Sequence, residues 1–455
     1  MQKALLHKLI AILALTLLIC LPMSLIQGTV RERSQYHDQA VTSVAADSVR
    51  EQTVIGPVVL IPYSEQYDEQ ISENGVARTV TRTLKREHIV FPNTLKVVGS
   101  FSTDRRHRGI HQVLVYSGAH ELAGDFTLPA LTELARTSEH ARISVGRASL
   151  AMGVEDVSGI RDIPKINWGG KVMEFEQGSG LRSFASGLHV NLGTPALDKA
   201  EAVSFAFNLG LDGIERQHFV PVAKNNVIQL QSKWEHPQFG GRFLPLVDER
   251  TSGADGFNAT WRISSLSSGA QQQLAGLEDK AAPRATTLAG LDRFSVGFIE
   301  PVNIYSMAER ATKYGLLFVA LTFAAFFMFE VLKRLPIHPV QYLLVGLALV
   351  LFFLLLVSLS ERIDFVASYL IASGACIVLI GFYLSFVLRD WRRGMGFGCA
   401  LTMLYGALFG LLVSENNALI MGSGLLFAVL AAVMVATRKV DWYQIGKAPS
   451  AALAA

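Results

Sequence analysis

Apolar residues form long uncharged runs in two parts of the chain, and elsewhere they alternate with polar residues. The first run is Leu9–Ile26, and further runs fill most of Tyr314–Tyr443. The segment between them, Arg31–Lys313, has the mixed composition of a water-soluble protein. Because a helix needs about 20 apolar residues to cross about 30 Å of hydrocarbon, the pattern predicts a membrane protein with one large water-facing insert.

The apolar runs predict six membrane-spanning helices. The first run could also be a cleaved signal sequence, but it is long for one and no small-x-small cleavage site follows it, so we expect an uncleaved anchor. The short connections between the later runs require neighbouring helices to be antiparallel. The predicted spans are Leu9–Ile26, Tyr314–Leu332, Val340–Leu359, Phe365–Leu388, Gly394–Val413 and Ala418–Ala436.

The basic residues predict the orientation, because Lys and Arg concentrate in the cytoplasmic loops of membrane proteins. With the N-terminus inside, ten of them lie in cytoplasmic segments and one, Arg362, lies in the two short outside loops. We therefore expect both termini in the cytoplasm and the insert in the periplasm of a bacterium with two membranes. The ten are Lys3, Lys8, Lys333, Arg334, Arg389, Arg392, Arg393, Arg438, Lys439 and Lys447.

These patterns divide the chain into four parts. Val41, Val44, Ala45 and Val49 recur at helical spacing, which predicts a helical stalk at the start of the insert. The stretch Ser306–Glu309 fits a capping box, which predicts that the helix containing the second span begins at Met307. The expected parts are the N-terminus with the first span (1–30), the insert (31–305), a five-helix bundle (306–443) and a low-complexity cytoplasmic tail (444–455).

The insert has the pattern of a β-rich domain. Val203, Phe205, Phe207 and Leu209 alternate with small or polar residues, as in a strand with one face on a core. Asn74-Gly75 between two strand-like runs predicts a tight hairpin turn. Many short strands with few helical windows indicate a β-sandwich or two stacked β-subdomains.

Composition and charge narrow the function. Charged residues make up only 17% of the chain, against about 25% in soluble domains. Arg31–Lys313 holds 30 Lys and Arg against 32 Asp and Glu, a net charge of −2 that argues against nucleic-acid binding. The three cysteines, Cys20, Cys376 and Cys399, all lie in apolar runs, so the insert has no disulfide of its own.

No sequence motif indicates catalysis. A P-loop, a G-x-S-x-G, an H-E-x-x-H and a Rossmann fingerprint are all missing from the sequence. His107, His111 and His120 invite a metal interpretation, but no cysteine or tight carboxylate group completes a tetrahedral set. We expect scattered surface histidines, no catalytic residues, no metal, no cofactor and no enzymatic activity.

Trp234, His236 and Phe239 belong to the densest group of unusual residues in the insert, Trp234–Gly241. They are candidates for a loop that binds a partner through its aromatic side chains. The alternative is a structural corner in which Trp234 and Phe239 fill the core and Pro237 sets a turn. The second interpretation is the simpler one, because buried aromatic residues usually belong to a core.

The spans carry two further signals. Gly394, Gly398, Thr402, Gly406 and Gly410 recur every four residues and predict a small-residue stripe for helix packing, either inside the bundle or between copies. Glu330 is the one carboxylate within a predicted span and is expected to form an interfacial ion pair with Lys333 or Arg334. Such a sparse set of ionisable residues argues against ion-coupled transport.

Two stretches carry a resemblance to a known family. Arg310-Ala311-Thr312-Lys313-Tyr314 and His338-Pro339-Val340-Gln341-Tyr342 resemble the inner-membrane CreD family, also called cell envelope integrity proteins. The loop Trp234–Pro245 and the turn Ile55-Gly56-Pro57 are similar to two further hallmarks, and the similarity runs to about Tyr443. It implies a bacterial inner-membrane protein linked to an envelope stress response, colicin tolerance and β-lactam susceptibility, without an assigned active site.

Three functional hypotheses follow. The first is a non-enzymatic envelope protein whose periplasmic domain binds an envelope protein, a lipid or peptidoglycan, with the lipid bilayer around its spans and a homo-oligomer as one possibility. The second is a transporter or channel for small molecules or lipids in the C-terminal helices. The third is an envelope hydrolase, which the missing acid/base and nucleophile residues disfavour.

Overall fold

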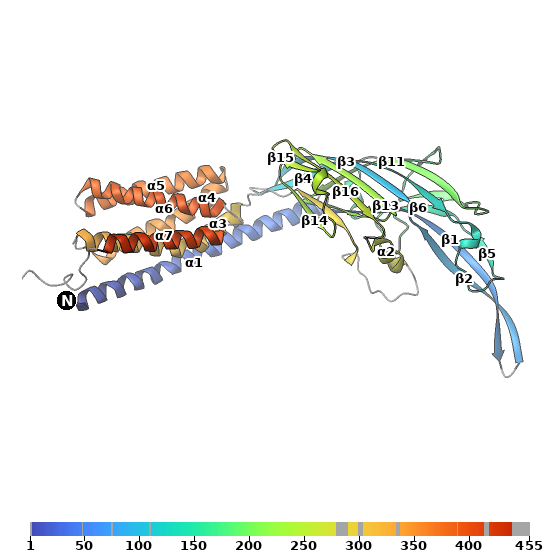
Figure 1. Cartoon of the computed structure of the whole chain (residues 1–455), viewed down its shortest axis with the longest axis horizontal. Helices are drawn as coiled ribbons and strands as arrows, with labels where there is room; N and C mark the ends of the chain where they lie inside the picture. The colour runs from blue at the N-terminus through green and yellow to red at the C-terminus, as the bar shows by residue number, and fades with distance from the viewer. Residues whose placement is uncertain are drawn as a thin grey trace, which may run out of the picture. The chain divides into compact units, whose positions relative to one another are not determined.

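The chain forms two compact units in a computed structural model (Figure 1). One consists of Met1–Asp38 and Val302–Ala455 and is helical, and the other, Gln39–Pro301, is built mainly of strands. A large β-rich region between the first two apolar helices is therefore confirmed. The structure describes residues 2–47, 49–73, 76–108, 111–278, 290–298, 304–333, 337–388, 390–413 and 418–438.

Long apolar helices make up the first unit. Five helices are long and apolar enough to cross a membrane, and the apolar stretch of the next, Ile420–Val435, is shorter. Five candidate spans are thus found among the described residues, and the sixth stays a prediction. The helices are α1 (Gln2–Asp47), α3 (Ile304–Lys333), α4 (Pro339–Ser360), α5 (Phe365–Val387), α6 (Trp391–Val413) and α7 (Ala418–Thr437).

Helix α1 includes the stalk that the sequence predicts, whereas α3 begins earlier than the sequence predicts. Helix α1 continues without a break to Asp47, so the first apolar run and the predicted stalk form one helix. Helix α3 begins at Ile304, so Ser306 lies within its first turn and the predicted cap at Ser306 is wrong. The reason is packing: Tyr305 is buried and its ring lies 5.7 Å from that of His37, so the helix extends upstream to make this contact with α1.

Close helix contacts hold this unit together. A Cβ atom at Gly315 of α3 would lie 2.8 Å from Cε of Met23 in α1 and 3.2 Å from Phe353 in α4. Glycine therefore lets three helices approach at one point, as small residues do in membrane proteins. The aromatic core around it includes Phe318, Phe323, Phe326, Tyr342, Phe352, Tyr369 and Tyr405.

Two sheets form the second unit. The nine-stranded sheet has the order β14-β17-β12-β1-β6-β10-β9, with β2 and β5 also paired to β1, and β1 runs parallel to β12. Its strands are β1 (Gln52–Glu73), β2 (Val76–Val90), β5 (Arg142–Val145), β6 (Ala148–Val154), β9 (Glu176–Gln177), β10 (Gly187–Gly193), β12 (Arg216–Val220), β14 (Pro237–Gly241) and β17 (Phe294–Phe298).

The eight-stranded sheet has the order β15-β16-β13-β3-β4-β11-β7-β8, and β13 runs parallel to β3. Its strands are β3 (Thr94–Arg108), β4 (His111–Leu128), β7 (Lys165–Trp168), β8 (Lys171–Glu174), β11 (Glu201–Ile214), β13 (Asn225–Ser232), β15 (Arg250–Gly253) and β16 (Gly256–Ser264). The unit also holds the helix α2 (Ala270–Glu278) and short 3₁₀ turns at Leu131–Glu133, Val157–Gly159 and Val247–Glu249.

The core of this unit lies between the two sheets. Along β11, inward and outward residues alternate as the sequence predicts, with Phe205 and Phe207 buried. Aromatic rings from opposite sheets meet, since Trp261 of β16 stacks on Phe294 of β17 with ring centroids 4.8 Å apart. One continuous apolar cluster contains residues of both sheets, so the arrangement is sandwich-like.

The hairpin of β1 and β2 is much longer than the strands beside it. Its register runs from Val59↔Val90 to Glu73↔Val76, and β5 accompanies β1 only as far as Gln66. The predicted turn Asn74-Gly75 lies outside the described residues. Beyond Gln66 the two strands leave the rest of the unit as a ribbon, which Figure 1 shows and which we call the arm.

Candidate functional site

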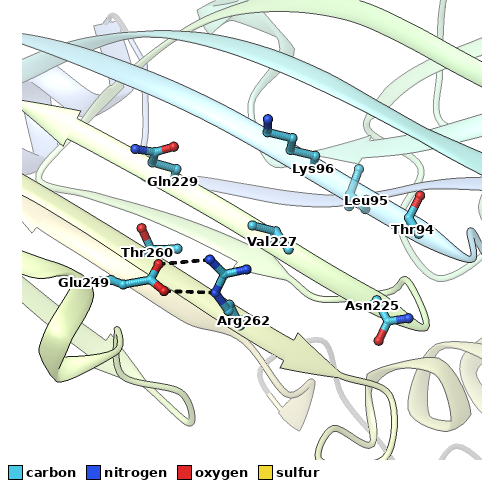
Figure 2. Close-up of a pocket in the computed structure, with 9 residues that line it drawn as sticks. All are labelled: Thr94, Leu95, Lys96, Asn225, Val227, Gln229, Glu249, Thr260 and Arg262. Carbon is cyan, nitrogen blue, oxygen red and sulfur yellow. Dashed lines mark hydrogen bonds and ion pairs between the residues drawn. The ribbon is translucent and has the colours of Figure 1, made fainter.

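A polar groove of about 440 Å³ lies on the outer face of the eight-stranded sheet (Figure 2). Strand β13 forms its floor because alternate residues point outward: Ile228 and Leu230 enter the core, while Val227 and Gln229 face the groove. The neighbouring strands β3 and β16 and the turn Val247–Glu249 supply the rest. The lining residues are Thr94, Leu95, Lys96, Asn225, Val227, Gln229, Glu249, Thr260 and Arg262.

The groove presents hydrogen-bonding groups of several kinds. Arg262 donates from Nε and Nη2 to the two carboxylate oxygens of Glu249 at 3.1 and 3.3 Å, which fixes both side chains on one wall. In Figure 2, Val227 lies between this ion pair and the side chains of Lys96 and Gln229. With two cations and one anion among the lining residues, the groove suits a polar or anionic ligand. None of the nine lining residues is His, Cys or Ser.

The predicted partner-binding loop is divided between core and surface. Phe239 on β14 packs edge-on against Phe257 and Trp261, with ring centroids 5.7 and 5.5 Å apart. Trp234 also packs against the core, and its Nε1 donates to the carbonyl of His236 at 3.1 Å. Of the three candidates only the His236 side chain is exposed. The two aromatic residues thus have a structural use, and partner binding by this loop stays a prediction.

The small-residue stripe of α6 contacts other helices at its ends. A Cβ atom at Gly394 would lie 2.8 Å from Ser385 Cα in α5, and one at Gly410 would lie 3.2 Å from Met421 Cε in α7. At Gly406 no described atom lies within 4 Å, Gly398 has one neighbour at 4.0 Å, and Thr402 is exposed. Positions four apart drift by about 40° a step, so the stripe winds from one neighbouring helix to the other.

Glu330 joins three helices at one end of the bundle. Its buried carboxylate accepts hydrogen bonds from Lys8 of α1 and from the Tyr342 hydroxyl of α4, the latter at 2.9 Å. An ion pair was expected here, but with a different partner. The side chain of Lys333, and all of Arg334, lie outside the described part of the chain.

The motif His338-Pro339-Val340-Gln341-Tyr342 has a local structural explanation. The His338 side chain accepts from the amide of Val340 at 3.3 Å, and the Gln341 side chain accepts from the amide of His338 at 3.2 Å. These two bonds form a capping box at the start of α4, with Pro339 in the first turn. Tyr342 then reaches Glu330, so the motif both starts α4 and ties it to α3.

His120 corrects the expectation of surface histidines, because its side chain lies in the sandwich core. It is opposite Gly99 on β3 and two residues from Gly118, and a Cβ atom at either glycine would lie 2.6 Å from a ring nitrogen. Its Nε2 lies 3.0 Å from Gln217 Nε2, and burial lowers the pKa of His120 to about 4. No group of three or more His, Cys, Asp or Glu residues within the described ranges is placed to hold a metal ion.

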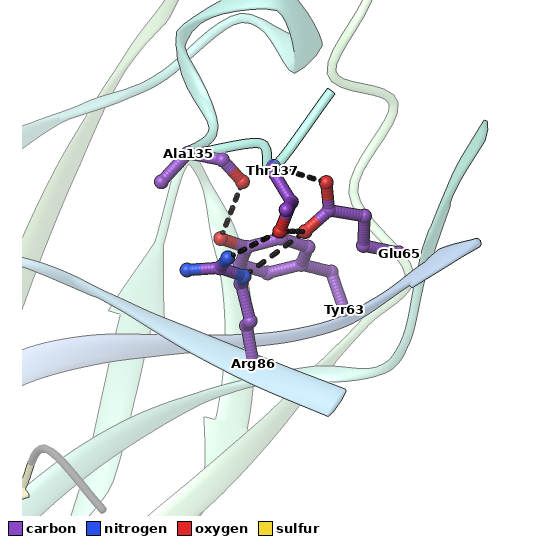
Figure 3. Close-up of polar contacts among 5 residues, drawn as sticks. All are labelled: Tyr63, Glu65, Arg86, Ala135 and Thr137. Atoms are coloured by element: carbon purple, nitrogen blue, oxygen red, sulfur yellow. Dashed lines mark hydrogen bonds and ion pairs between the residues drawn. The ribbon is translucent and has the colours of Figure 1, made fainter. Parts of the chain in front are cut away.

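A second buried polar cluster, around Glu65, fixes the loop after β4 to the hairpin (Figure 3). The fully buried Glu65 carboxylate accepts from the amide and hydroxyl of Thr137 and from Arg86 Nε at 3.1 Å. The Tyr63 hydroxyl donates to the carbonyl of Ala135 at 2.9 Å. Burial alone would raise the pKa of Glu65, but the hydrogen bonds from Thr137 and Ser138 and the charge of Arg86 together lower that pKa.

Sequence reasoning missed the groove and the buried polar clusters of His120 and Glu65, and at Glu330 it predicted an ion pair but not its partner Lys8. Alternation along Asn225–Ser232 shows which residues face outward, but not which strands lie beside them. For the cluster of Glu65, the sequence offers one indication: charged residues recur at even intervals within a segment that otherwise has the pattern of a strand.

Comparison with known proteins gives a consistent match along the chain. A family model described as "Inner membrane protein CreD" matches residues 4–443. The inner membrane protein CreD of Escherichia coli (strain K12) is 34% identical over 446 residues, which covers 97% of this chain and 95% of that protein.

Proposed function

This chain belongs to the inner membrane protein CreD family, and on that premise we propose that it is a non-enzymatic protein that supports the integrity of the cell envelope. The name of the family supports the location of this protein in the inner membrane. The β-rich unit is the part that binds an envelope component, and the apolar helices anchor it.

The proposed topology has six spans, with both termini in the cytoplasm and the β unit in the periplasm. Its support is the charge bias of the connecting segments together with two ion pairs of α1. Lys8 binds Glu330, and Arg33 lies 3.5 Å from Glu361 in the connection of α4 and α5. The 25 residues from Lys8 to Arg33 span about 38 Å of helix, slightly more than the hydrocarbon core. Each polar contact would therefore lie near one membrane surface.

The groove is the observation that supports a binding role for the β-rich unit. Its lining combines two amides, two hydroxyls, a lysine and an arginine held by Glu249. Such a set can donate to and accept from a hydrated polymer without acting on it chemically. Peptidoglycan has that character, since its strands carry hydroxyl, amide and carboxylate groups.

The transporter alternative lacks a supporting observation. Glu330 is the one buried charged residue in the described part of the helical unit, and Lys8 and Tyr342 already bind it. A proton or ion pathway needs several such groups along its course.

Co-sedimentation of the full-length protein in lipid nanodiscs with purified peptidoglycan sacculi tests this function. The double variant Lys96→Glu/Gln229→Ala should bind about tenfold less, because it reverses one charge and removes one amide in the groove. The matched control is Lys199→Glu, an exposed lysine outside the groove. Equal binding by all three proteins, or no binding by the unsubstituted one, would contradict the proposal.

A further inference from the structure

The arm consists of Tyr67–Glu73 of β1 and Val76–Arg82 of β2, which pair only with each other within the described residues. At about 3.4 Å per residue, these seven pairs extend roughly 24 Å beyond the sheet. An isolated two-stranded ribbon is marginally stable in water. Both of its outer edges also present backbone groups that a further strand can use.

The arm carries a regular arrangement of charge on one face. Directly opposite residues of an antiparallel pair point to the same side, and the register pairs Tyr67 with Arg82 and Glu69 with Val80. Glutamates and arginines therefore alternate with apolar residues along the two strands of this face. The β1 row is Glu65, Tyr67 and Glu69, and the β2 row is Arg78, Val80, Arg82, Leu84 and Arg86.

Within one molecule the two rows already bind each other. Arg82 forms an ion pair with Glu69, and Arg86 Nε lies 3.1 Å from Glu65. The side chains of Arg82 and Glu69 remain 54% and 44% exposed, so both can accept a second partner from outside. A guanidinium has five donors, which allows contact with carboxylates on both sides.

The two outer edges are of opposite charge. The β1 part of the arm holds Asp68, Glu69 and Glu73, a charge of −3, whereas the β2 part holds Arg78 and Arg82, a charge of +2. When one copy is translated sideways beside another, β2 of the first meets β1 of the second in antiparallel orientation with the same faces aligned. We propose that arms of neighbouring copies pair in this way, head to tail, so that the row of arginines in one copy binds the row of glutamates in the next.

The charges of the two strands favour head-to-tail pairing of β2 with β1 over a twofold pairing of β2 with β2. A twofold arrangement would place β2 against β2, with arginines facing arginines, and like charges directly opposite destabilise a sheet. Head-to-tail contacts do not close on themselves and give open rows of molecules. The proposal is independent of the groove and does not require that the groove binds peptidoglycan.

Cysteine crosslinking of the full-length protein in membranes tests the geometry. Gln70 and Thr79 are directly opposite within one hairpin, so the same register between copies brings Gln70→Cys of one copy to Thr79→Cys of another. Co-expression of the two variants under different tags should give a mixed dimer, and either variant alone should give none. Parallel experiments use Thr81→Cys or Thr83→Cys in place of Thr79→Cys, so that strand registers shifted by two or four residues between the copies are also tested. A homodimer of Thr79→Cys, or no mixed dimer at any of the three positions, would overturn the proposal.

A charge exchange in trans separates pairing between copies from pairing within one. Arg82→Glu in the Thr79→Cys copy should reduce the mixed dimer about fivefold, the effect of about 1 kcal/mol. Adding Glu69→Arg to the Gln70→Cys copy should restore it, because the exchanged charges then attract only between molecules. Lys199→Glu serves as the remote control and should leave the dimer unchanged. Failure of the restoration, with both proteins present in the membrane at normal levels, would contradict the proposed pairing.

Discussion

Lys8 of α1 and Glu330 of α3 form an ion pair although 322 residues separate them in the chain. Lys8→Met should lower the thermal stability of the detergent-solubilised protein, by up to about 3 kcal/mol, because it removes the counter-charge of a buried carboxylate and leaves it with the Tyr342 hydroxyl and the Ile337 amide. Adding Glu330→Gln should recover part of the loss, since an uncharged amide needs no counter-ion. A double variant as unstable as Lys8→Met alone would show that the charge is not what matters.

His120 should make the stability of the β unit depend on pH. Its pKa is about 4 when folded and about 6.5 when unfolded, so protonation favours the unfolded state. The contribution is complete above about pH 6.5 and is lost as the pH falls, by about 3 kcal/mol at pH 4. Chemical unfolding of the full-length protein at pH 7, 6 and 5 measures it. His120→Leu should flatten the slope and the exposed His140→Leu should not; an unchanged slope in His120→Leu would assign the effect elsewhere.

The hydrogen bonds of Thr137 to Glu65 should be measurable one at a time. Thr137→Val removes the hydroxyl that donates to Glu65 at 3.0 Å and accepts from Arg86 Nη2 at 2.8 Å, and it keeps the amide, so we expect a loss of about 1 kcal/mol. Glu65→Leu removes the acceptor for Thr137 and Arg86 together and should cost more. Limited proteolysis of the segment 129–141 provides the readout, and equal cleavage in both variants and the unsubstituted protein would contradict the role of this cluster.

Gly394 and Gly406 should differ sharply despite their shared place in the stripe. Gly394→Leu would push a side chain into the α5 backbone near Ser385 and should lower the amount of folded protein in the membrane. A Cβ atom at Gly406 meets no described atom within 4 Å, so Gly406→Leu should be tolerated in a single molecule. A smaller species of Gly406→Leu in light scattering would instead indicate that this part of the stripe joins copies.

The proposed topology predicts opposite results for two fusions. Alkaline phosphatase fused after Arg250 should be active because that position would be periplasmic, and a fusion after Lys439 should be inactive because six spans return the chain to the cytoplasm. Activity after Lys439 would remove one span from the topology. Green fluorescent protein at the same positions gives the reciprocal control.

Most helices and strands could be predicted from residues that are close together in the chain. Uncharged runs of about 20 residues predict the apolar helices, and alternation of buried and exposed residues predicts β11. These features depend on residues within a few positions of each other, so periodicity and chemistry are enough to find them. The start of α3 was misjudged at Ser306 because contact with α1 extends that helix.

Contacts between residues far apart in the chain could not be predicted from local patterns. The groove exists because β13 lies beside β3 and β16, and His120 is buried because Gly99 is opposite it in the register. Glu330 binds Lys8 because α1 packs against α3. Strand order and helix packing minimise the free energy of the whole chain, and a local pattern is compatible with many such orders. The buried polar pairs therefore follow from the global arrangement, in which each desolvated group must find a partner.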